Sequence, residues 1–479
     1  MELFELIQTL NTAHGPSGDE GAVREVIAAL ARPHADEVTA DTLGNLIVRK
    51  RGSGPKVMLC AHMDSTGLIV THIGKEGFLR VGTLGGIAAR ELLYTPVRFK
   101  NGVRGVIVPE EKAEFGKLKL DACYVDIGAK DEEQARRMVQ VGDTAVYDTA
   151  IFLSGDKVVS PYLDNRISCA VLLRVLEELD ACPNDLYLVF SAQEEVGLRG
   201  ARTAAWSIDP DYALAVDVTD VDDTPGSEKL GTVRLGQGAA VKVMDRSVIC
   251  HPQLVETLER LAAEREIPVQ RDIMRGGGTD AGAIHTTRMG VLTGGVSVPC
   301  RYIHTPTEMA DLGDAAACVK LLAAFAQEEL TRLEKAFGYT YEDVKNTILP
   351  MARTGAEPTA AMGVDIPLAV LDNRDRPLFS YFKQLFAQVT NPPMDAIREE
   401  IVTDTTVYVG SGGNLLEERA ENCTVLQIHN PILTSVDLMK IRYMDRPGFH
   451  VETISLLYYK GSPLANALDR LFVNVDRAY

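Results

Sequence analysis

The chain has 479 residues, of which 46% are hydrophobic, and a formal net charge of −18. This length and apolar content predict more than one folded domain with an ample core. The acidity argues against nucleic-acid binding, and no apolar run approaches the roughly 20 residues needed to cross a bilayer. We therefore expect neither nucleic acid nor a membrane as a partner. The N-terminal sequence is typical of an amphipathic helix rather than of a signal peptide, so we expect a cytoplasmic protein.

Eight cysteines are scattered along the chain without a CxxC motif or any close pair. This spacing indicates neither a thiolate zinc site nor a disulfide framework. We expect free thiols in or near the cores.

Helix-like and strand-like segments alternate along the first 335 residues. Helical periodicity is found at residues 1–15, 20–35, 251–266 and 314–337, and short apolar runs typical of strands at 56–60, 185–192, 212–218 and 290–303. This alternation predicts an α/β fold with a mixed, mainly parallel sheet and helices on both faces.

Histidine or acidic residues stand at the end of each strand-like run. They are His62 and Asp64, then Glu194 and Glu195, then Asp217, and finally His304, while Asp164 lies in the motif LDNR. In open α/β sheets such strand ends line the ligand crevice. A pair of divalent ions roughly 3.5–4 Å apart needs one carboxylate that touches both ions and at least one further ligand for each. These residues provide such a set of ligands, and the pattern predicts a two-metal hydrolase site.

Each of these residues also has a simpler interpretation. A single Asp or Glu at a strand end is more often solvated or caps a helix, and a lone histidine is more often hydrogen-bonded in a core or at the surface. LDNR itself recurs at Leu371 to Arg374. The complete constellation, rather than any one motif, favours the metal site.

Several further residues remain open at this stage. The role of metal ligand assigned to Asp217 could instead fall to one of three aspartates that follow closely, Asp220, Asp222 and Asp223. Lining the cleft and a structural role are both open for His14, His285 and Glu308. Arg166 is expected to pair with nearby carboxylates.

On the motifs AHMDSTG, LDNR, AQEEVGLRGA and HTPTE, about the first 335 residues resemble the dinuclear aminopeptidases of the glutamyl aminopeptidase and tetrahedral (TET) aminopeptidase family. The resemblance implies that His62 and Asp217 bind one metal, that Glu195 and His304 bind the other, and that Asp164 bridges them. It implies two divalent ions per subunit, zinc or cobalt. Glu194 would be the general base, and Asp64 would orient the imidazole of His62. A cis peptide bond between Asp164 and Asn165 is implied as well.

The order of the motifs distinguishes this family from aminoacylases and dipeptidases, which insert their extra domain after the Glu-Glu pair. Here the long interval lies between Asp64 and Asp164 and holds short β-like runs. We therefore assign residues 1–68 and 159–335 to the catalytic domain and residues 69–158 to an inserted small β-barrel-like domain. The resemblance implies that this domain serves dimerisation, that the protein is a homo-oligomer (a dimer or a dodecamer), and that the loop GGGTDAGAIH from Gly276 borders the substrate pocket.

Residues 336–479 resemble part of the central domain of the glutamate synthase large subunit, through FGYTYEDV from Phe337, MGVDIPLAVL from Met362 and SYFKQLFAQVTNPPMDAIREE from Ser380. The flavin barrel and any cysteine spacing suited to an iron–sulfur cluster are missing. We expect a C-terminal α/β extension that cannot make glutamate by itself and acts as a structural or interaction module.

These patterns predict a metal-dependent aminopeptidase that removes N-terminal residues from short peptides, by attack of a metal-bridging water with Glu194 as general base. A deacylase or dipeptidase that uses the same metals is an alternative. A non-catalytic assembly module associated with glutamate synthase is another, and it predicts co-purification with that enzyme and no need for Glu194. An endoglucanase is disfavoured, because glycoside hydrolysis uses two opposed carboxylic groups.

Overall fold

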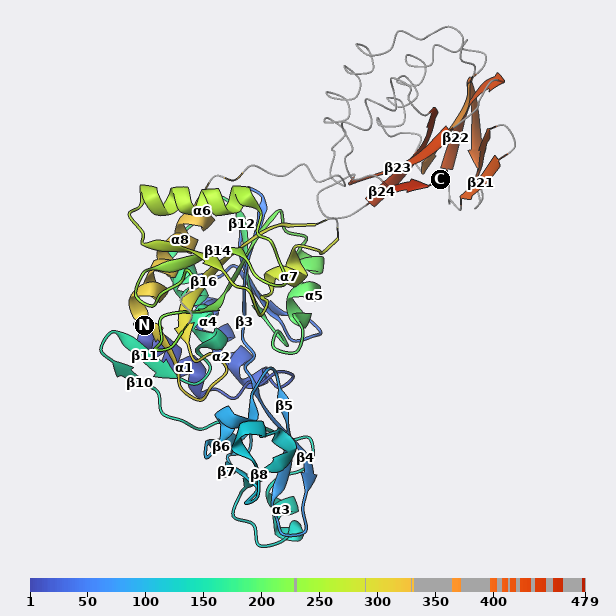
Figure 1. Cartoon of the computed structure of the whole chain (residues 1–479). Helices are drawn as coiled ribbons and strands as arrows, with labels where there is room; N and C mark the ends of the chain where they lie inside the picture. Colours follow the sequence, from blue (N-terminus) through green and yellow to red (C-terminus); the bar gives the residue numbers. More distant parts are fainter. Residues whose placement is uncertain are drawn as a thin grey trace. The chain divides into compact units, whose positions relative to one another are not determined.

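The chain folds into two compact units, Met1–Arg332 and Leu333–Tyr479 (Figure 1). This computed structural model describes residues 1–227, 231–288, 290–328 and 330, and beyond these only the backbone of strands β18 to β25. Among the described residues, no helix has the length and apolar character that crossing a membrane requires.

An 11-stranded sheet forms the centre of the first unit, in the order β1-β2-β12-β3-β13-β16-β17-β11-β10, with β14 beside β16 and β15 beside β14. The central strands β12, β3, β13 and β16 are parallel to one another, and antiparallel strands extend the sheet on both sides. The strands are β1 (Glu37–Ala40), β2 (Leu46–Lys50), β3 (Lys56–His62), β10 (Phe152–Ser154), β11 (Lys157–Ser160), β12 (Asp185–Ser191), β13 (Tyr212–Asp220), β14 (Ala239–Met244), β15 (Val269–Ile273), β16 (Leu292–Arg301) and β17 (Glu308–Asp311).

Helices pack on this sheet, as the alternating pattern predicts. They are α1 (Leu3–Thr12), α2 (Gly21–Ala31), α4 (Leu163–Glu178), α5 (Arg199–Ile208), α6 (Pro252–Glu264), α7 (Ala281–Ile284) and α8 (Leu312–Ala326). Side chains alternate across a strand, so Met58 and Cys60 of β3 share one face and pack in a core with α5 and α7. Helix α4 packs against β3, β13, α1 and α8. The predicted fold class, a mixed α/β sheet flanked by helices, is confirmed.

One predicted helix is shorter than expected. The pattern predicts a helix up to residue 337, but α8 ends at Ala326. The carbonyl oxygen of Ala326 accepts hydrogen bonds from the Cys182 thiol at 3.1 Å and from the Asn184 side chain at 3.0 Å. These side chains satisfy a backbone acceptor that the next helical turn would otherwise use.

The predicted small β-domain contains a closed six-stranded barrel in the order β4-β5-β8-β7-β6-β9. Its strands are β4 (Gly67–Ile73), β5 (Leu79–Leu84), β6 (Pro96–Phe99), β7 (Arg104–Pro109), β8 (Cys123–Asp126) and β9 (Thr144–Tyr147), and α3 (Glu132–Met138) lies between the last two. Its interior is a separate apolar cluster that includes Phe99, Ile107 and Val125. Closure leaves no sheet edge unpaired. The assigned limits, 69–158, and the role in dimerisation remain predictions.

The second unit contains a six-stranded antiparallel sheet in the order β19-β22-β18-β24-β23-β25 and a separate hairpin of β20 and β21. The strands are β18 (Val364–Leu371), β19 (Ile397–Val402), β20 (Val407–Ser411), β21 (Asn414–Glu418), β22 (Cys423–Pro431), β23 (Val436–Met444), β24 (Val451–Tyr459) and β25 (Asp476–Ala478). MGVDIPLAVL overlaps β18. The last four residues of the motif from Ser380 lie in β19. The rest of that motif, the motif from Phe337 and the last three residues of the second LDNR lie outside the described residues.

Seven cysteines lie in the part of the chain whose side chains are described, and all seven are free and buried. The expectation of core thiols is confirmed for them.

A buried ion pair joins β14 to β15. The Lys242 ammonium lies 2.6 Å from the Asp272 carboxylate, and the two side chains are 1% and 2% exposed. Removing one partner leaves the other charge buried and unpaired. We predict that Lys242→Met lowers the free energy of unfolding by about 3–5 kcal/mol, measured by chemical denaturation.

The double variant with Lys242→Met and Asp272→Leu is the control, because it removes both charges and is expected to recover most of that loss. A loss below about 1 kcal/mol in the single variant, the upper end for exposed pairs, would contradict the assignment.

Candidate metal centre

The carboxyl ends of four parallel strands carry most of the predicted site residues. His62 ends β3 and Asp64 follows it, Glu194 and Glu195 lie in the turn after β12, Asp217 lies near the end of β13, and His304 follows β16. Because parallel strands place their carboxyl ends at one edge of the sheet, these side chains meet there. Asp164 lies in the first turn of α4, which packs against β3 and β13.

The backbone around Asp164 departs from the helix that follows it. Asp164 has φ −76° and ψ 105°, and the Asp164–Asn165 peptide bond is cis, as the resemblance implies. The Asn165 side chain donates to the carbonyl oxygen of Val216 at 2.8 Å. This hydrogen bond ties the start of α4 to β13 beside Asp217.

The Asp164 carboxylate lies between two imidazoles. Its Oδ1 is 3.1 Å from His62 Nε2, and its Oδ2 is 3.2 Å from His304 Nε2. His62 Nε2 is also 3.6 Å from Asp217 Oδ1 and 3.8 Å from Glu194 Oε2. His304 Nε2 is 3.2 Å from Glu195 Oε2. The structure thus brings together all six residues that the sequence predicts around the metals.

The other ring nitrogen of each histidine faces a backbone carbonyl. His62 Nδ1 lies 3.1 Å from the Asp64 carbonyl oxygen, and His304 Nδ1 lies 2.7 Å from that of Gly86. A carbonyl oxygen only accepts, so each Nδ1 carries the proton and donates it. In the neutral imidazoles both Nε2 lone pairs therefore point at carboxylate oxygens. A cation between the nitrogen and the oxygens satisfies both.

Two buried carboxylate oxygens in this cluster have no hydrogen-bond partner, Asp164 Oδ1 and Glu195 Oε1. A buried polar atom without a partner is costly unless another ligand satisfies it. Two triads, His62 with Asp164 and Glu195, and His62 with Glu194 and Asp217, each hold their ligand atoms within 4.8 Å of one another. Imidazole nitrogen and carboxylate oxygen are the ligands that zinc and related ions take. The residues present therefore fit a metal ion.

The electrostatics of the cluster favour positive charge. Burial lowers the pKa of His304, but the carboxylates of Asp164 and Glu195 outweigh it and raise the pKa to about 12. Burial likewise lowers the pKa of His62, and Glu194 and Asp217 reverse the effect, so its pKa lies well above the usual range. Burial also raises the pKa of Glu195, to about 7. A field that draws protons into buried groups in this way also favours a divalent cation.

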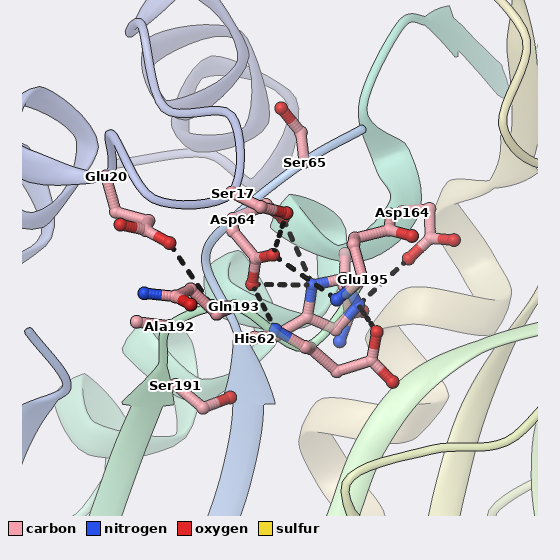
Figure 2. A network of polar contacts seen from close by, with 12 residues as sticks. Ser17, Glu20, His62, Asp64, Ser65, Asp164, Ser191, Ala192, Gln193 and Glu195 are labelled. Carbon is pink, nitrogen blue, oxygen red and sulfur yellow. Dashed lines mark hydrogen bonds and ion pairs between the residues drawn. The ribbon is translucent and has the colours of Figure 1, made fainter. Parts of the chain in front are cut away.

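The predicted role of Asp64 differs in detail from the contacts observed (Figure 2). Its carboxylate lies 3.6 Å from His62 Nδ1, farther than the Asp64 main-chain oxygen that accepts from this ring. The carboxylate instead accepts the backbone N–H groups of Glu194 at 3.0 Å and Glu195 at 3.3 Å. Asp64 therefore holds the His62 ring through its main chain and the Glu-Glu turn through its side chain.

Glu308 makes two specific contacts that its motif does not predict. Its Oε2 accepts the N–H of Asp164 and its Oε1 accepts the N–H of His304, both at 2.8 Å. The side chain is 2% exposed. Glu308 thus fixes the backbone of two predicted ligands from different elements.

Arg166 was expected to pair with carboxylates, and this expectation is wrong. The guanidinium is fully buried and donates to the backbone carbonyl oxygens of Leu10, Ala13 and Gly15 at 2.6–3.1 Å. It also lies over the ring of Tyr162. Arg166 thus binds main-chain carbonyl groups at and after the end of α1, where helical carbonyl groups lack a full set of partners within the helix.

His14 and His285 are not brought into the cluster. His14 Nε2 contacts the Thr144 hydroxyl at 2.8 Å and Asp19 at 3.3 Å. His285, the residue after α7, donates from Nδ1 to the carbonyl oxygen of Ala281 at the start of that helix. Both contacts agree with the structural interpretation.

Two of the three competing aspartates, Asp222 and Asp223, are engaged elsewhere, whereas Asp220 ends β13. Asp223 forms a bidentate pair with Arg301 at 2.7 and 2.9 Å, and Asp222 accepts the N–H of Gly231. The position of Asp217 in β13 directs its side chain at His62 instead.

One carboxylate near the site was missed. Asp280, in the glycine-rich loop, is 2% exposed and accepts from the Ser191 hydroxyl and the Cys60 thiol. Burial raises its pKa to about 6. The sequence signal that points to Asp280 is an acidic residue in a glycine-rich loop, and this pattern is also common in ordinary turns.

Two family models match the chain. The M42 glutamyl aminopeptidase model matches residues 44–321, and the glutamate synthase central domain model matches residues 332–479. The chain belongs to the M42 glutamyl aminopeptidase family. It is a metal-dependent aminopeptidase, a hydrolase of peptide bonds, followed by a segment of the glutamate synthase central-domain type, and both predictions are confirmed at this level.

Several known proteins resemble the M42 part. A putative aminopeptidase of Acetivibrio thermocellus is 47% identical over 322 residues, which are 67% of this chain and 97% of that protein. The lysyl aminopeptidase of Pyrococcus furiosus is 37% identical over 341 residues, 68% of this chain and 97% of that protein.

Solved structures agree with these matches. The aminopeptidase APDkam598 of Desulfurococcus kamchatkensis has a TM-score of 0.66 and 39% identity, covering 68% of this chain and 94% of that one. The TET1 peptidase of Pyrococcus horikoshii, described as able to assemble into a tetrahedron or a large octahedral shell, has a TM-score of 0.62 and 32% identity, covering 68% and 100%.

The C-terminal segment is 41% identical over 149 residues to the glutamate synthase [NADPH] large chain of Bacillus subtilis, which is 31% of this chain but only 10% of that protein.

The double contact of Glu308 predicts a measurable effect on metal binding. In Glu308→Gln one acceptor oxygen becomes an NH₂ group that faces a backbone N–H, so one of the two hydrogen bonds is lost. We expect the affinity for zinc or cobalt to fall about tenfold or more, measured by competition with a chromophoric chelator. Glu178→Gln, at an exposed glutamate of the same α4, is the matched control, and equal affinities in the two variants would contradict this role.

Proposed function

We propose that this M42 aminopeptidase removes single N-terminal residues from short peptides with two divalent ions, zinc or cobalt. His62 and Asp217 would hold one ion, Glu195 and His304 the other, and Asp164 would touch both. The observation that carries this proposal is the Asp164 carboxylate, whose two oxygens face the Nε2 atoms of two different histidines. In the neutral imidazoles each of those atoms offers a lone pair, because the opposite ring nitrogen carries the proton and donates it to a carbonyl group.

Bound divalent ions would polarise the scissile carbonyl and make water more acidic. Glu194 is suited to take the proton from the attacking water. Its carboxylate reaches the cluster at 3.8 Å from His62 Nε2, the longest of the three carboxylate contacts of this nitrogen. Once protonated, Glu194 can act as the general acid and give the proton to the leaving amine.

The free amine of the substrate would bind beside the carboxylates, and this requirement separates an aminopeptidase from a deacylase or dipeptidase. Aminopeptidase names among the relatives support the first assignment. An N-acetyl group removes the positive charge that the acidic cluster favours.

We also propose a homo-oligomer, a dimer or a dodecamer, supported by the assemblies described for the Pyrococcus horikoshii relative. The match to glutamate synthase covers a tenth of that protein. It supports a shared segment rather than an association with that enzyme.

The proposal predicts the effect of removing the base. Glu194→Gln keeps the size of the side chain and removes its ability to accept a proton, so kcat on free aminoacyl p-nitroanilides should fall by about 10²–10⁴. Bound zinc or cobalt, counted by elemental analysis, should be unchanged. The matched control is Glu178→Gln, which should cleave at the parental rate.

The same assay includes N-acetylated substrates, and the proposal predicts that they are not cleaved. Cleavage of acetylated substrates alone would favour the deacylase instead. If the Glu194→Gln variant keeps kcat within tenfold of the parent, Glu194 is not the general base.

A further inference from the structure

Two buried carboxylates hold the turn that carries Glu194 and Glu195. Three successive backbone N–H groups of this turn each donate to one of them. The N–H of Gln193 donates to Glu20 Oε1 at 3.1 Å, and those of Glu194 and Glu195 donate to Asp64 Oδ1 and Oδ2 at 3.0 and 3.3 Å. Glu20 and Asp64 are 5% and 0% exposed.

The turn needs this support because of its backbone conformation. Gln193 has φ +57°, in the left-handed region that residues other than glycine rarely adopt. A left-handed residue persists when surrounding contacts fix it, and a buried N–H without an acceptor costs about 1–3 kcal/mol. The acceptor on Glu20 therefore determines the direction in which the chain leaves Gln193, and with it the position of the Glu194 side chain.

A short N-terminal segment, Ser17–Glu20, holds both carboxylates in place (Figure 2). The Ser17 hydroxyl donates to Asp64 Oδ2 at 2.6 Å, and the N–H of Gly18 donates to Glu20 Oε1 at 2.7 Å. The Ser17 N–H also donates to the carbonyl oxygen of Ser65 at 3.1 Å, which ties the segment to the chain just after His62 and Asp64. The region matched by the M42 model begins only at residue 44.

We propose that Ser17 and Glu20 are positioning residues for catalysis: they fix the backbone of residues 193–195 and thereby aim the Glu194 carboxylate at the reacting water. This inference rests on the proposed role of Glu194 as general base. Neither residue touches the predicted metals. Displacement of a catalytic group by about 1 Å can cost on the order of 10² in rate, so the loss of one acceptor should appear in kcat.

Glu20 offers a matched pair of variants. Glu20→Met has a similar length but no acceptor, whereas Glu20→Gln keeps the Oε1 acceptor for Gly18 and Gln193 and loses only the charge. We expect Glu20→Met to lower kcat by about 10- to 100-fold, with KM within about twofold and metal content unchanged. Glu20→Gln should recover kcat to within about threefold of the parent. Ser17→Ala, which removes one donor to Asp64, should lower kcat by about 3- to 30-fold.

A double variant tests whether Glu20 acts through Glu194. In the Glu194→Gln background the base is already absent, so adding Glu20→Met should leave the residual kcat within about twofold. The control for general destabilisation is Asp314→Leu, since Asp314 is a buried carboxylate that accepts the backbone N–H groups of Gly236 and Gly238. It should lower the unfolding temperature and leave kcat at the parental value.

The proposal is overturned if folded, metal-loaded Glu20→Met and Ser17→Ala both keep the parental kcat while Glu194→Gln is inactive. It is also overturned if Glu20→Met lowers the residual rate of Glu194→Gln by the same factor as in the parent, because Glu20 would then act elsewhere. If Glu20→Met does not fold, Ser17→Ala and its combination with Glu194→Gln decide by the same criteria. An active Glu194→Gln single variant marks the failure of the proposed function itself.

Discussion

The Asp164 carboxylate faces the Nε2 atoms of two histidines at 3.1 and 3.2 Å, and both imidazoles donate their Nδ1 protons to carbonyl groups on the far side. When the imidazoles are neutral, the lone pairs of their Nε2 atoms therefore face the lone pairs of carboxylate oxygens. Glu195 and Asp217 bring further negative charge to the same histidines. Buried like charges at these distances are expensive unless a cation lies among them. The rest of the site maintains this arrangement.

Three buried carboxylates maintain it by binding backbone N–H groups rather than rings. Glu308 holds the main chain of Asp164 and His304, Asp64 holds that of Glu194 and Glu195, and Glu20 holds that of Gln193. Each joins segments distant in sequence, such as Glu308 and Asp164, 144 residues apart, and Glu20 and Gln193, 173 residues apart. The sheet supplies the coarse placement through its parallel strand ends, and these carboxylates supply the fine placement. Such support is what precise metal and catalytic geometry requires.

The difference between this coarse placement by the strands and the fine placement by buried carboxylates explains what the sequence could predict. His62 and Glu194 follow long apolar runs, so the strand pattern alone places them at one edge of a parallel sheet. Glu308 was recognised only as a residue near the cleft, since its partners are backbone amides that carry no sequence signature. Arg166 was misassigned for the same reason, because its carbonyl acceptors at the end of α1 leave no trace in residue types. The shortened α8 likewise depends on side chains from a loop more than 140 residues away.

The central claim is that Asp164 lies between two metal ions, and a crystal structure of the cobalt-loaded protein with anomalous scattering data tests it most directly. The account predicts two anomalous peaks roughly 3.5–4 Å apart. One would be bound by His62 and Asp217, the other by Glu195 and His304, and Asp164 would coordinate both. A single peak in fully loaded protein, or two peaks without Asp164 between them, would contradict it.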